Sequence, residues 1–346
     1  RNVFGRAYRF LTDARVGEDD LRFRTLFEQP YIRGLPVGML YELFTIEEDR
    51  ESFEAERWVG RIEASHQRER DRFSLAYDYR LIEPEDFQDP LLVTIPDPSR
   101  EDGTREVVDP SILSVFERKE DDPDDPSVQV SSIFSGMFLD RRDDVVSPTR
   151  GWTVNAQLQY AFPFASAEPH FAELFLQHTN YLSLGDWGVL AGSVRLAAIE
   201  PFESVPGSDE NPLLVVPLDE RLFSGGRTTH RAFDRFELGI VGETLFGEPP
   251  VPGPIGGTGL ALVNLEYRFP VFGPVGGTLF TDVGQVWRDW QDFDPGELRL
   301  GVGIGARYLS PIGPLRVDVG FKVEGRVDLK EFASPGQAPE ISVGDE

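Results

Sequence analysis

The sequence predicts an all-β fold, a transmembrane antiparallel β-barrel, from three observations. Several segments of nine or more residues alternate apolar and polar side chains almost without error. Successive side chains of a strand point to opposite faces of its sheet, so each such segment has one apolar and one polar face. No segment has a helical period or approaches the roughly 20 continuous apolar residues of a membrane-spanning helix. Strands of about 9–11 residues match the tilted spans of an outer-membrane barrel.

About 13 strands are expected along the chain. Those with the cleanest alternation are 72–81, 152–160, 298–308 and 315–322. The less regular ones lie at about 5–14, 20–28, 35–46, 55–66, 128–139, 171–182, 187–199, 259–269 and 277–287. The polar faces carry Arg, Asp, Glu and Gln, as the wall of a water-filled lumen does. Aromatic residues near strand ends are expected in the interfacial girdles: Tyr31, Trp58, Tyr160, Tyr181, Trp187, Trp287 and Tyr308.

The connections alternate between short and long, which gives the barrel an orientation. Short turns, expected on the periplasmic side, lie at 29–34, 67–70, 141–151, 183–186, 270–276 and 310–313. Long connections, expected outside, lie at 83–127, 200–258 and 323–340. The first of them is rich in proline and acid, including Glu120–Asp125, and is expected to be a solvated surface loop. A Ca²⁺ site there is the alternative, but the spaced ligands of a known cation loop are missing.

A soluble β-protein with one wet and one buried face is the competing fold. Its two sheets would have to match their apolar faces, and its strands would usually be shorter. Because all the regular strands here share one amphipathic design, a single closed barrel explains them more simply.

Composition excludes several functional classes. The chain has 34 Lys and Arg against 60 Asp and Glu, a formal net charge of −26, which opposes binding to a nucleic-acid backbone. It has no cysteine, so disulfides, thiolate metal sites and cysteine nucleophiles are excluded. The four histidines show no metal-binding spacing, and Gly301-x-Gly303-x-Gly305 lies within a strand where a nucleotide loop would open a helix. We expect no catalytic residue, metal or cofactor.

Four short signatures occur in order across nearly the whole chain. They are Asp140-Arg141-Arg142-Asp143 with Ser147-Pro148-Thr149-Arg150-Gly151; Val216 to Phe233 (VPLDERLFSGGRTTHRAF); Asn264 to Pro270 (NLEYRFP) with Phe280 to Gly284 (FTDVG); and Ser310-Pro311-Ile312-Gly313-Pro314-Leu315-Arg316-Val317-Asp318. Together they resemble the BamA/TamA superfamily of outer-membrane barrel-assembly proteins. The family turns correspond here to Asp140, Arg142, Asp143, Pro148, Gly151, Pro311, Gly313 and Pro314.

The resemblance implies a family barrel of 16 strands, of which this chain carries roughly strands 3–15, with a long loop folded into the lumen. Asn2–Arg6 then resembles the turn before the third strand. We expect residues 1–346 to form one outer-membrane barrel domain, trimmed at both ends, with the POTRA domains outside this chain.

In the resemblance, the inward loop carries a motif at its tip, Gly225, Gly226, Arg231, Ala232 and Phe233. Ala232 replaces a family glycine, and His230 replaces a valine-like residue.

The expected wall partners of Arg231 are Glu266 and Asp282, on adjacent strands, because two carboxylates can accept an arginine fork. A generic lumen arginine is the alternative for Arg231. The glycines of strand 298–308 either leave room for the loop or only make the strand flexible.

By this resemblance, the protein is expected to insert and fold client β-barrel proteins in the bacterial outer membrane through a lateral seam, without nucleotide hydrolysis. Its expected partners are unfolded outer-membrane clients, membrane lipids and lipopolysaccharide, and accessory lipoproteins or a periplasm-spanning partner. A two-partner-type polypeptide secretion pore and a passive porin-like channel are the alternatives. A porin should lack the link between Arg231 and its two carboxylates.

Overall fold

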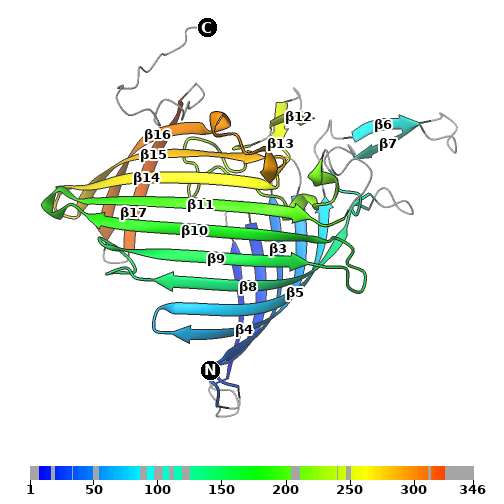
Figure 1. Cartoon of the computed structure of the whole chain (residues 1–346), viewed down its shortest axis with the longest axis horizontal. Helices are drawn as coiled ribbons and strands as arrows, with labels where there is room; N and C mark the ends of the chain where they lie inside the picture. Colours follow the sequence, from blue (N-terminus) through cyan, green and yellow to red (C-terminus); the bar gives the residue numbers. More distant parts are fainter. Residues whose placement is uncertain are drawn as a thin grey trace, which may run out of the picture.

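One antiparallel sheet of 13 strands makes up the wall of the molecule, in the order β1-β2-β3-β4-β5-β8-β9-β10-β11-β14-β15-β16-β17. The computed structural model describes residues 8–16, 20–32, 34–49, 54–85, 92–96, 104–108, 113–118, 125–203, 211–239, 241–246, 251–310 and 313–323. The sheet curves into an incomplete barrel (Figure 1). Its end strands, β1 and β17, border the same interior cavity through Arg15 and Arg316.

The wall strands are long, and most strands that are consecutive in the chain pair with each other as antiparallel hairpins. Their bounds are β1 Arg9–Val16, β2 Asp20–Gln29, β3 Gly38–Asp49, β4 Glu54–Arg68, β5 Asp71–Glu85, β8 Val128–Asp140, β9 Gly151–Ala161, β10 Phe171–Ser183, β11 Val189–Pro201, β14 Gly259–Phe272, β15 Val275–Trp287, β16 Arg299–Ser310 and β17 Gly313–Val323. Each of the 13 predicted strands overlaps one of them. The all-β prediction is therefore confirmed, although the described sheet is not closed.

Two small hairpins lie outside the wall and were not predicted. They are β6 Leu92–Pro96 with β7 Thr104–Val108, and β12 Val241–Phe246 with β13 Val251–Pro254. The first lies in the connection 83–127 and the second in the connection 200–258, the two longest of the chain. Strands this short have too few residues to show a clear alternation of apolar and polar side chains. Short 3₁₀ turns lie at Gly185–Trp187, Pro212–Leu214, Leu218–Glu220, Trp290–Asp292 and Pro295–Glu297. Within the described ranges, no helix is long and apolar enough to cross a membrane.

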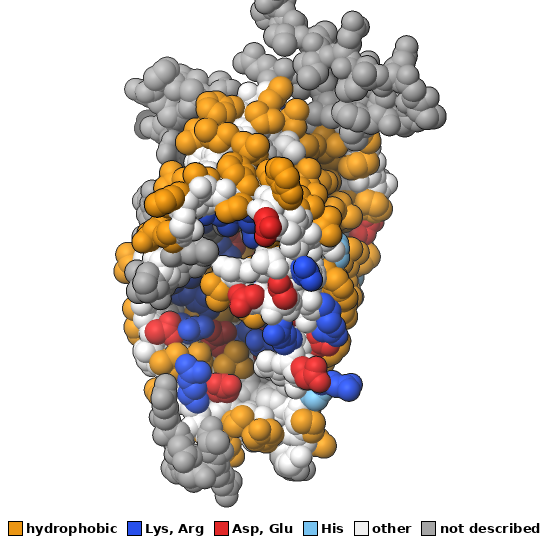
Figure 2. Space-filling model, turned by 90° about the vertical axis from the view of Figure 1, so that its left-hand side faces the viewer, with side chains coloured by type: hydrophobic (Ala, Val, Ile, Leu, Met, Phe, Trp, Pro, Cys, Tyr) orange, Lys and Arg blue, Asp and Glu red, His pale blue; other side chains and the backbone are white. Residues whose placement is uncertain are grey.

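The two faces of the sheet differ as the alternation predicts. On β10 and β11 the outward Leu174, Leu176 and Leu196 are 55%, 40% and 46% exposed, which suits a lipid-facing surface. The inward face carries ion pairs such as Arg61 with Asp78, whose atoms lie 2.7 Å apart. Seen from the short-turn end, hydrophobic side chains gather around the outside and charged ones lie in the central hollow (Figure 2).

Two aromatic predictions are wrong. Tyr181 faces the lumen, where it lines a cavity and lies under the guanidinium of Arg268, because its position on β10 has inward parity. Trp287 is only 4% exposed, since the connection after β15 covers it and Glu297 accepts its indole N–H. The segment Asn2–Arg6, which carried the expected first turn, lies outside the described residues.

An apolar cluster fills the long-connection end of the lumen. Ile82, Val130, Phe171 and Ile199 on the wall pack with Val216 from the chain that enters the barrel. Each of them is fully buried, so this end of the interior is filled by side chains instead of water.

The long connection 83–127 departs in part from the solvated loop that was expected. Within it, Leu113, Ser114 and Glu117 are buried, and the Val115 N–H donates to the Leu214 carbonyl. The reason is that this stretch packs against the inward segment. Of the acidic run Glu120–Asp125, only Asp125 is among the described residues.

Candidate functional site

The candidate site is the inward segment, residues 211–239, and the wall that holds it. The segment leaves β11, enters the lumen and turns back at Gly225 and Gly226, whose φ angles are +119° and +89°. Glycine adopts such angles without steric cost. A Cβ at Gly225 would also collide with the Asp234 carbonyl oxygen, so the two glycines serve the turn.

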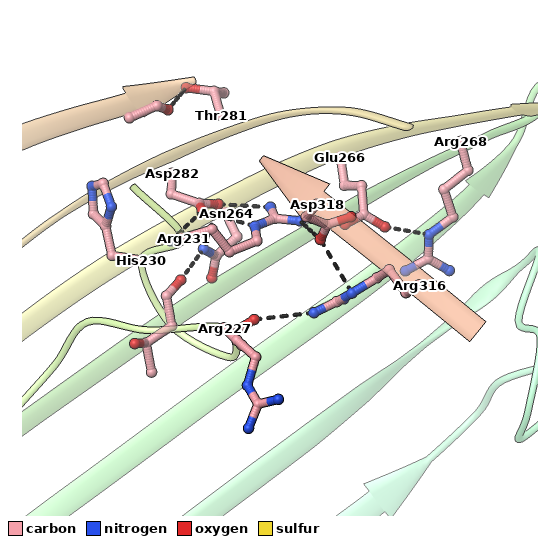
Figure 3. A network of polar contacts seen from close by, with 12 residues as sticks. Arg227, His230, Arg231, Asn264, Glu266, Arg268, Thr281, Asp282, Arg316 and Asp318 are labelled. Atoms are coloured by element: carbon pink, nitrogen blue, oxygen red, sulfur yellow. Dashed lines mark hydrogen bonds and ion pairs between the residues drawn. The ribbon is translucent and has the colours of Figure 1, made fainter. Parts of the chain in front are cut away.

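Arg231 is bound by the two carboxylates that the sequence paired with it. Its Nε and Nη2 donate to Asp282 at 2.9 and 2.8 Å, and its Nη1 donates to Glu266 at 2.7 Å (Figure 3). Its backbone N–H also donates to Asp282 at 2.9 Å. Burial alone would lower the pKa of Arg231, but these bonds outweigh it and the pKa is raised above its usual value.

The structure adds partners that sequence reasoning missed. Asp318, on β17, lies 3.4 Å from Nη1 of Arg231. Asn264 donates to Asp282 and to the Thr229 carbonyl, both at 2.7 Å, so it joins the wall to the loop. Both residues belong to motifs already singled out, and their inward parity was the available signal. The Arg231 guanidinium also stacks on Phe280, 3.5 Å from the ring centre.

Glu266 is shared by three arginines. It accepts from Arg231 at 2.7 Å, from Arg268 at 2.5 Å and from Arg307 on β16. Charge-assisted bonds of this kind are stronger than neutral ones, particularly away from bulk water. This carboxylate therefore ties the loop tip to two strands of the wall.

The glycines of β16 make room for this arrangement. A Cβ at Gly301 would come within 2.6 Å of Ala232 and His230 on the loop. A Cβ at Gly303 would meet the Phe280 ring, and one at Gly305 would meet the Asp318 carboxylate. The sequence left two interpretations of these glycines open, room for the loop or flexibility of the strand. These contacts support the first, that the glycines leave room for the loop.

The two departures from the family motif fit the site locally. Ala232 is not among the described residues with positive φ, so its side chain causes no backbone strain. His230 is fully buried and packs edge-on against Phe233, with ring centres 4.7 Å apart. Burial lowers the pKa of His230, so the neutral ring donates from Nε2 to the Arg299 carbonyl at 3.1 Å.

A second anchor holds the other part of the inward segment. Asp219 lies 2.9 Å from Arg57, and Glu220 lies 2.7 Å from Arg80, both on the opposite wall. The buried Arg221 donates to the carbonyls of Val216, Leu213 and Ile255.

The connection before β8 is tied to the same segment. Glu117, 1% exposed, accepts from the backbone N–H groups of Ser114 and Leu218. Burial raises the pKa of Glu117, while burial lowers the pKa of the neighbouring Arg221 to about 10.

The remaining predicted residues lie in the short turns, away from the site. Asp140 accepts two bonds from the Arg142 guanidinium, at 3.0 and 2.8 Å. Asp143 accepts from the Thr149 hydroxyl at 2.5 Å. Gly151 has a φ of +100°. Pro148 is buried, Gly313 pairs with Ser310 and Pro314 with Leu309, and Pro311 lies outside the described residues.

The site offers binding and anchoring groups. No cluster of three or more His, Asp or Glu arranged for a metal ion occurs in the described part of the chain. The arrangement can hold a loop against a wall through buried ion pairs and can release it only at high cost.

Comparison with known proteins places this geometry in context. The sequence model of the Omp85 superfamily domain matches residues 2–331. An outer membrane protein assembly factor BamA from Nitratidesulfovibrio vulgaris is 29% identical over 203 residues, which cover 57% of this chain and 24% of that protein. The chloroplastic outer envelope protein 80 of Arabidopsis thaliana is 35% identical over 182 residues, 47% of this chain and 25% of that protein. The match thus spans about a quarter of each of these relatives.

A solved structure shares the fold. The crystal structure of BamA from Haemophilus ducreyi lacking POTRA domains 1-3 superposes with a TM-score of 0.73, covering 94% of this chain and 63% of that chain. The sequence identity is 16%, so this likeness concerns the fold alone.

Proposed function

The chain belongs to the Omp85 superfamily as an outer-membrane β-barrel, and from that premise we propose that it inserts and folds client β-barrel proteins in the outer membrane. The observation that carries the proposal is the inward loop, whose Arg231 is held by Glu266, Asp282 and Asp318. A passive porin-like channel is expected to lack the link between Arg231 and these carboxylates.

The proposed mechanism is strand addition at a lateral seam, without nucleotide hydrolysis. In lipid no backbone polar group can stay unpaired, so a client strand must form hydrogen bonds as it enters. An edge strand offers a row of N–H and C=O groups that can template such a strand. The anchored loop ties β14, β15 and β17 together, so this part of the wall would stay fixed while the seam opens.

We propose unfolded outer-membrane proteins as clients, with lipid, lipopolysaccharide and accessory lipoproteins or a periplasm-spanning protein as partners. The clients' exposed strands supply the unpaired backbone groups that the seam would accept. The outward apolar belt supplies the lipid contact.

The test is client insertion by the full-length protein in liposomes. An unfolded barrel client is added, and protease-protected, heat-modifiable client is scored with wild type, Arg231→Ala and Arg72→Ala. Arg72, a half-exposed arginine that pairs with Glu63 elsewhere on the wall, is the control.

We expect Arg231→Ala to reduce insertion about tenfold or more, because it leaves buried carboxylates unpaired. Arg72→Ala should insert like wild type. A wild type that inserts no client but conducts ions steadily would overturn the proposal in favour of a secretion pore or a porin-like channel.

A further inference from the structure

Two adjoining spaces lie inside the barrel on either side of the loop tip. One, of about 280 Å³, is bounded by β10, β11, β14 and the loop residues Arg227 to Thr229. The other, of about 890 Å³, is bounded by the same loop residues and by β1 and β17. Arg227 and Arg316 border both spaces, so we treat them as one chamber.

The chamber carries positive charge although the chain as a whole carries −26. The smaller space is lined by a single carboxylate, Glu266, and by arginines from four different segments. These arginines are Arg195, Arg227, Arg231, Arg268 and Arg316. Arg231 pairs with Asp282, Asp318 and Glu266, Arg316 shares Asp318, and Arg268 and Arg307 share Glu266. Four guanidinium groups are thus met by three carboxylates, so the lining keeps a positive excess.

Arg195 is an arginine of the lining that has no carboxylate partner among the described residues. Its guanidinium has no carboxylate within ion-pair distance among the described residues, and its one hydrogen bond is a long 3.4 Å contact with Gln177. Its Nε is buried without a hydrogen-bond partner. A desolvated guanidinium is costly unless it is paired, so an oxyanion beside it would be stabilised.

The smaller space of the chamber lies toward the short-turn end of the barrel. Tyr181, Arg268 and Arg316 lie within a few residues of the turns that end β10, β14 and β16. Viewed from that end, blue side chains line the hollow (Figure 2). Family orientation puts short turns on the periplasmic side, the side from which clients would arrive.

We propose that this arginine-lined chamber binds the carboxylate side chains of an acidic polypeptide segment that enters from the short-turn end. The inference rests on the proposed function in taking a client polypeptide as the source of that segment. Arginine forks match carboxylates in geometry as well as charge. The remaining lining, with Gln177, Thr179 and Ser193, offers hydrogen bonds to a peptide backbone.

The lining favours a peptide over a lipid. Acyl chains need an apolar surface. Phe223, Phe233 and Phe236 line the larger space, whereas the arginine-rich smaller space is lined mostly by polar side chains. A lipid headgroup alone would have to leave its bilayer to reach the arginines. The combined space also accommodates several side chains, more than a single free phosphate would fill.

The experiment measures peptide binding to the full-length protein in nanodiscs. The probes are a fluorescent strand-forming peptide with several Glu residues and the same peptide with Gln at each Glu position, with inorganic phosphate as competitor. The variants are Arg195→Gln with Arg227→Gln for the chamber, and Arg72→Gln as the control, since Arg72 pairs with Glu63 and lines neither space. Heat-modifiable migration shows that each variant is folded.

The acidic peptide should bind at least about tenfold more tightly than the Gln peptide, a difference of about 1.4 kcal/mol. The chamber variant should lose that preference, and Arg72→Gln should keep it. The preference should shrink as ionic strength rises from about 0.05 to about 0.5 M.

Three outcomes would overturn the proposal. Equal binding of the two peptides would exclude carboxylate recognition. Displacement of the acidic peptide by phosphate at equimolar concentration would identify a small-anion site. Equal loss of preference in Arg72→Gln would indicate only the general electrostatic field of the lumen. Client insertion, measured in parallel, separates the two proposals. Insertion without a preference for the acidic peptide would overturn only the proposal for the chamber. A preference for the acidic peptide without insertion would overturn only the proposed insertase function.

Discussion

Arg231 uses all three of its side-chain nitrogens on carboxylates, and the carboxylates do not contribute equally. Asp282 accepts three bonds from it, one of them from the backbone, whereas Asp318 accepts one at 3.4 Å. Asp282 is also fully buried. The motif resemblance led to Glu266 and Asp282, but not to Asp318, which is 87 positions away along the chain. No local sequence pattern links Asp318 to Arg231.

Substitution at the two acids should therefore have unequal effects. Asp282→Ala leaves a buried guanidinium and a buried N–H without their acceptor, so we expect a destabilisation of about 3–5 kcal/mol. Asp318→Ala should cost clearly less. Urea unfolding in lipid vesicles measures both, and equal losses would contradict the ranking.

The Asp143 turn should respond to pH. The bond from the Thr149 hydroxyl, followed by the backbone N–H groups of Arg150 and Thr149, lowers the pKa of Asp143 well below its usual value. A lowered pKa stabilises the fold above the unfolded value of about 3.9, and that contribution is lost as the pH falls through the folded pKa. Hydrogen exchange at Thr149 and Arg150, corrected for intrinsic rates, should show strong protection at neutral pH and loss only in strong acid. Asp143→Asn with wild-type protection at neutral pH would refute this.

At the scale of elements, β16 and β17 carry glycines where the inward loop packs against them. Gly301 on β16 lies against Ala232 and His230, and a Cβ at Gly320 on β17 would come within 2.5 Å of the Arg231 carbonyl oxygen. The alternation predicted both strands and their inward faces. The particular neighbours come from a loop that is far away in sequence, and no local pattern encodes them.

Gly301→Ala should loosen the loop. The new methyl group has no space, and overpacking typically costs about 1–3 kcal/mol. Trypsin should then cleave at Arg227 or Arg231 faster than in wild type. Gly60→Ala on β4 is the control, because its Cβ would meet atoms only at 3.6 Å and beyond, and it should leave cleavage unchanged. Equal cleavage in both variants would contradict the role of Gly301.

At the scale of the whole molecule, the inward segment joins opposite parts of the wall. Arg231 reaches β14, β15 and β17, and Asp219 and Glu220 reach Arg57 on β4 and Arg80 on β5. The contacts of Asp219 and Glu220, together with the buried cluster around Val216, fill the long-connection end of the interior.

Releasing the second anchor should open this end. In Asp219→Ala with Glu220→Ala, the segment loses its ion pairs with β4 and β5. Breaking a buried pair worth a few kcal/mol should raise the open fraction by about tenfold or more. We therefore expect the ion conductance of the reconstituted full-length protein to rise by about the same factor. Planar-bilayer recording measures it, with Arg72→Ala as control. Conductance equal to wild type would show that the apolar cluster alone seals this end.

The sequence by itself determined the 13 wall strands and their lipid-facing and inward sides, because alternation is a local property that any strand expresses along its own length. It also paired Arg231 with Glu266 and Asp282 through the resemblance of short motifs. Only the tertiary structure decided that Asp318 and Asn264 join them, that Glu117 and its neighbours are buried, and that Tyr181 lines a chamber. Those outcomes depend on how segments far apart in the chain pack inside a curved sheet. Contacts between such segments follow no periodic pattern along the sequence, so the sequence alone does not predict them.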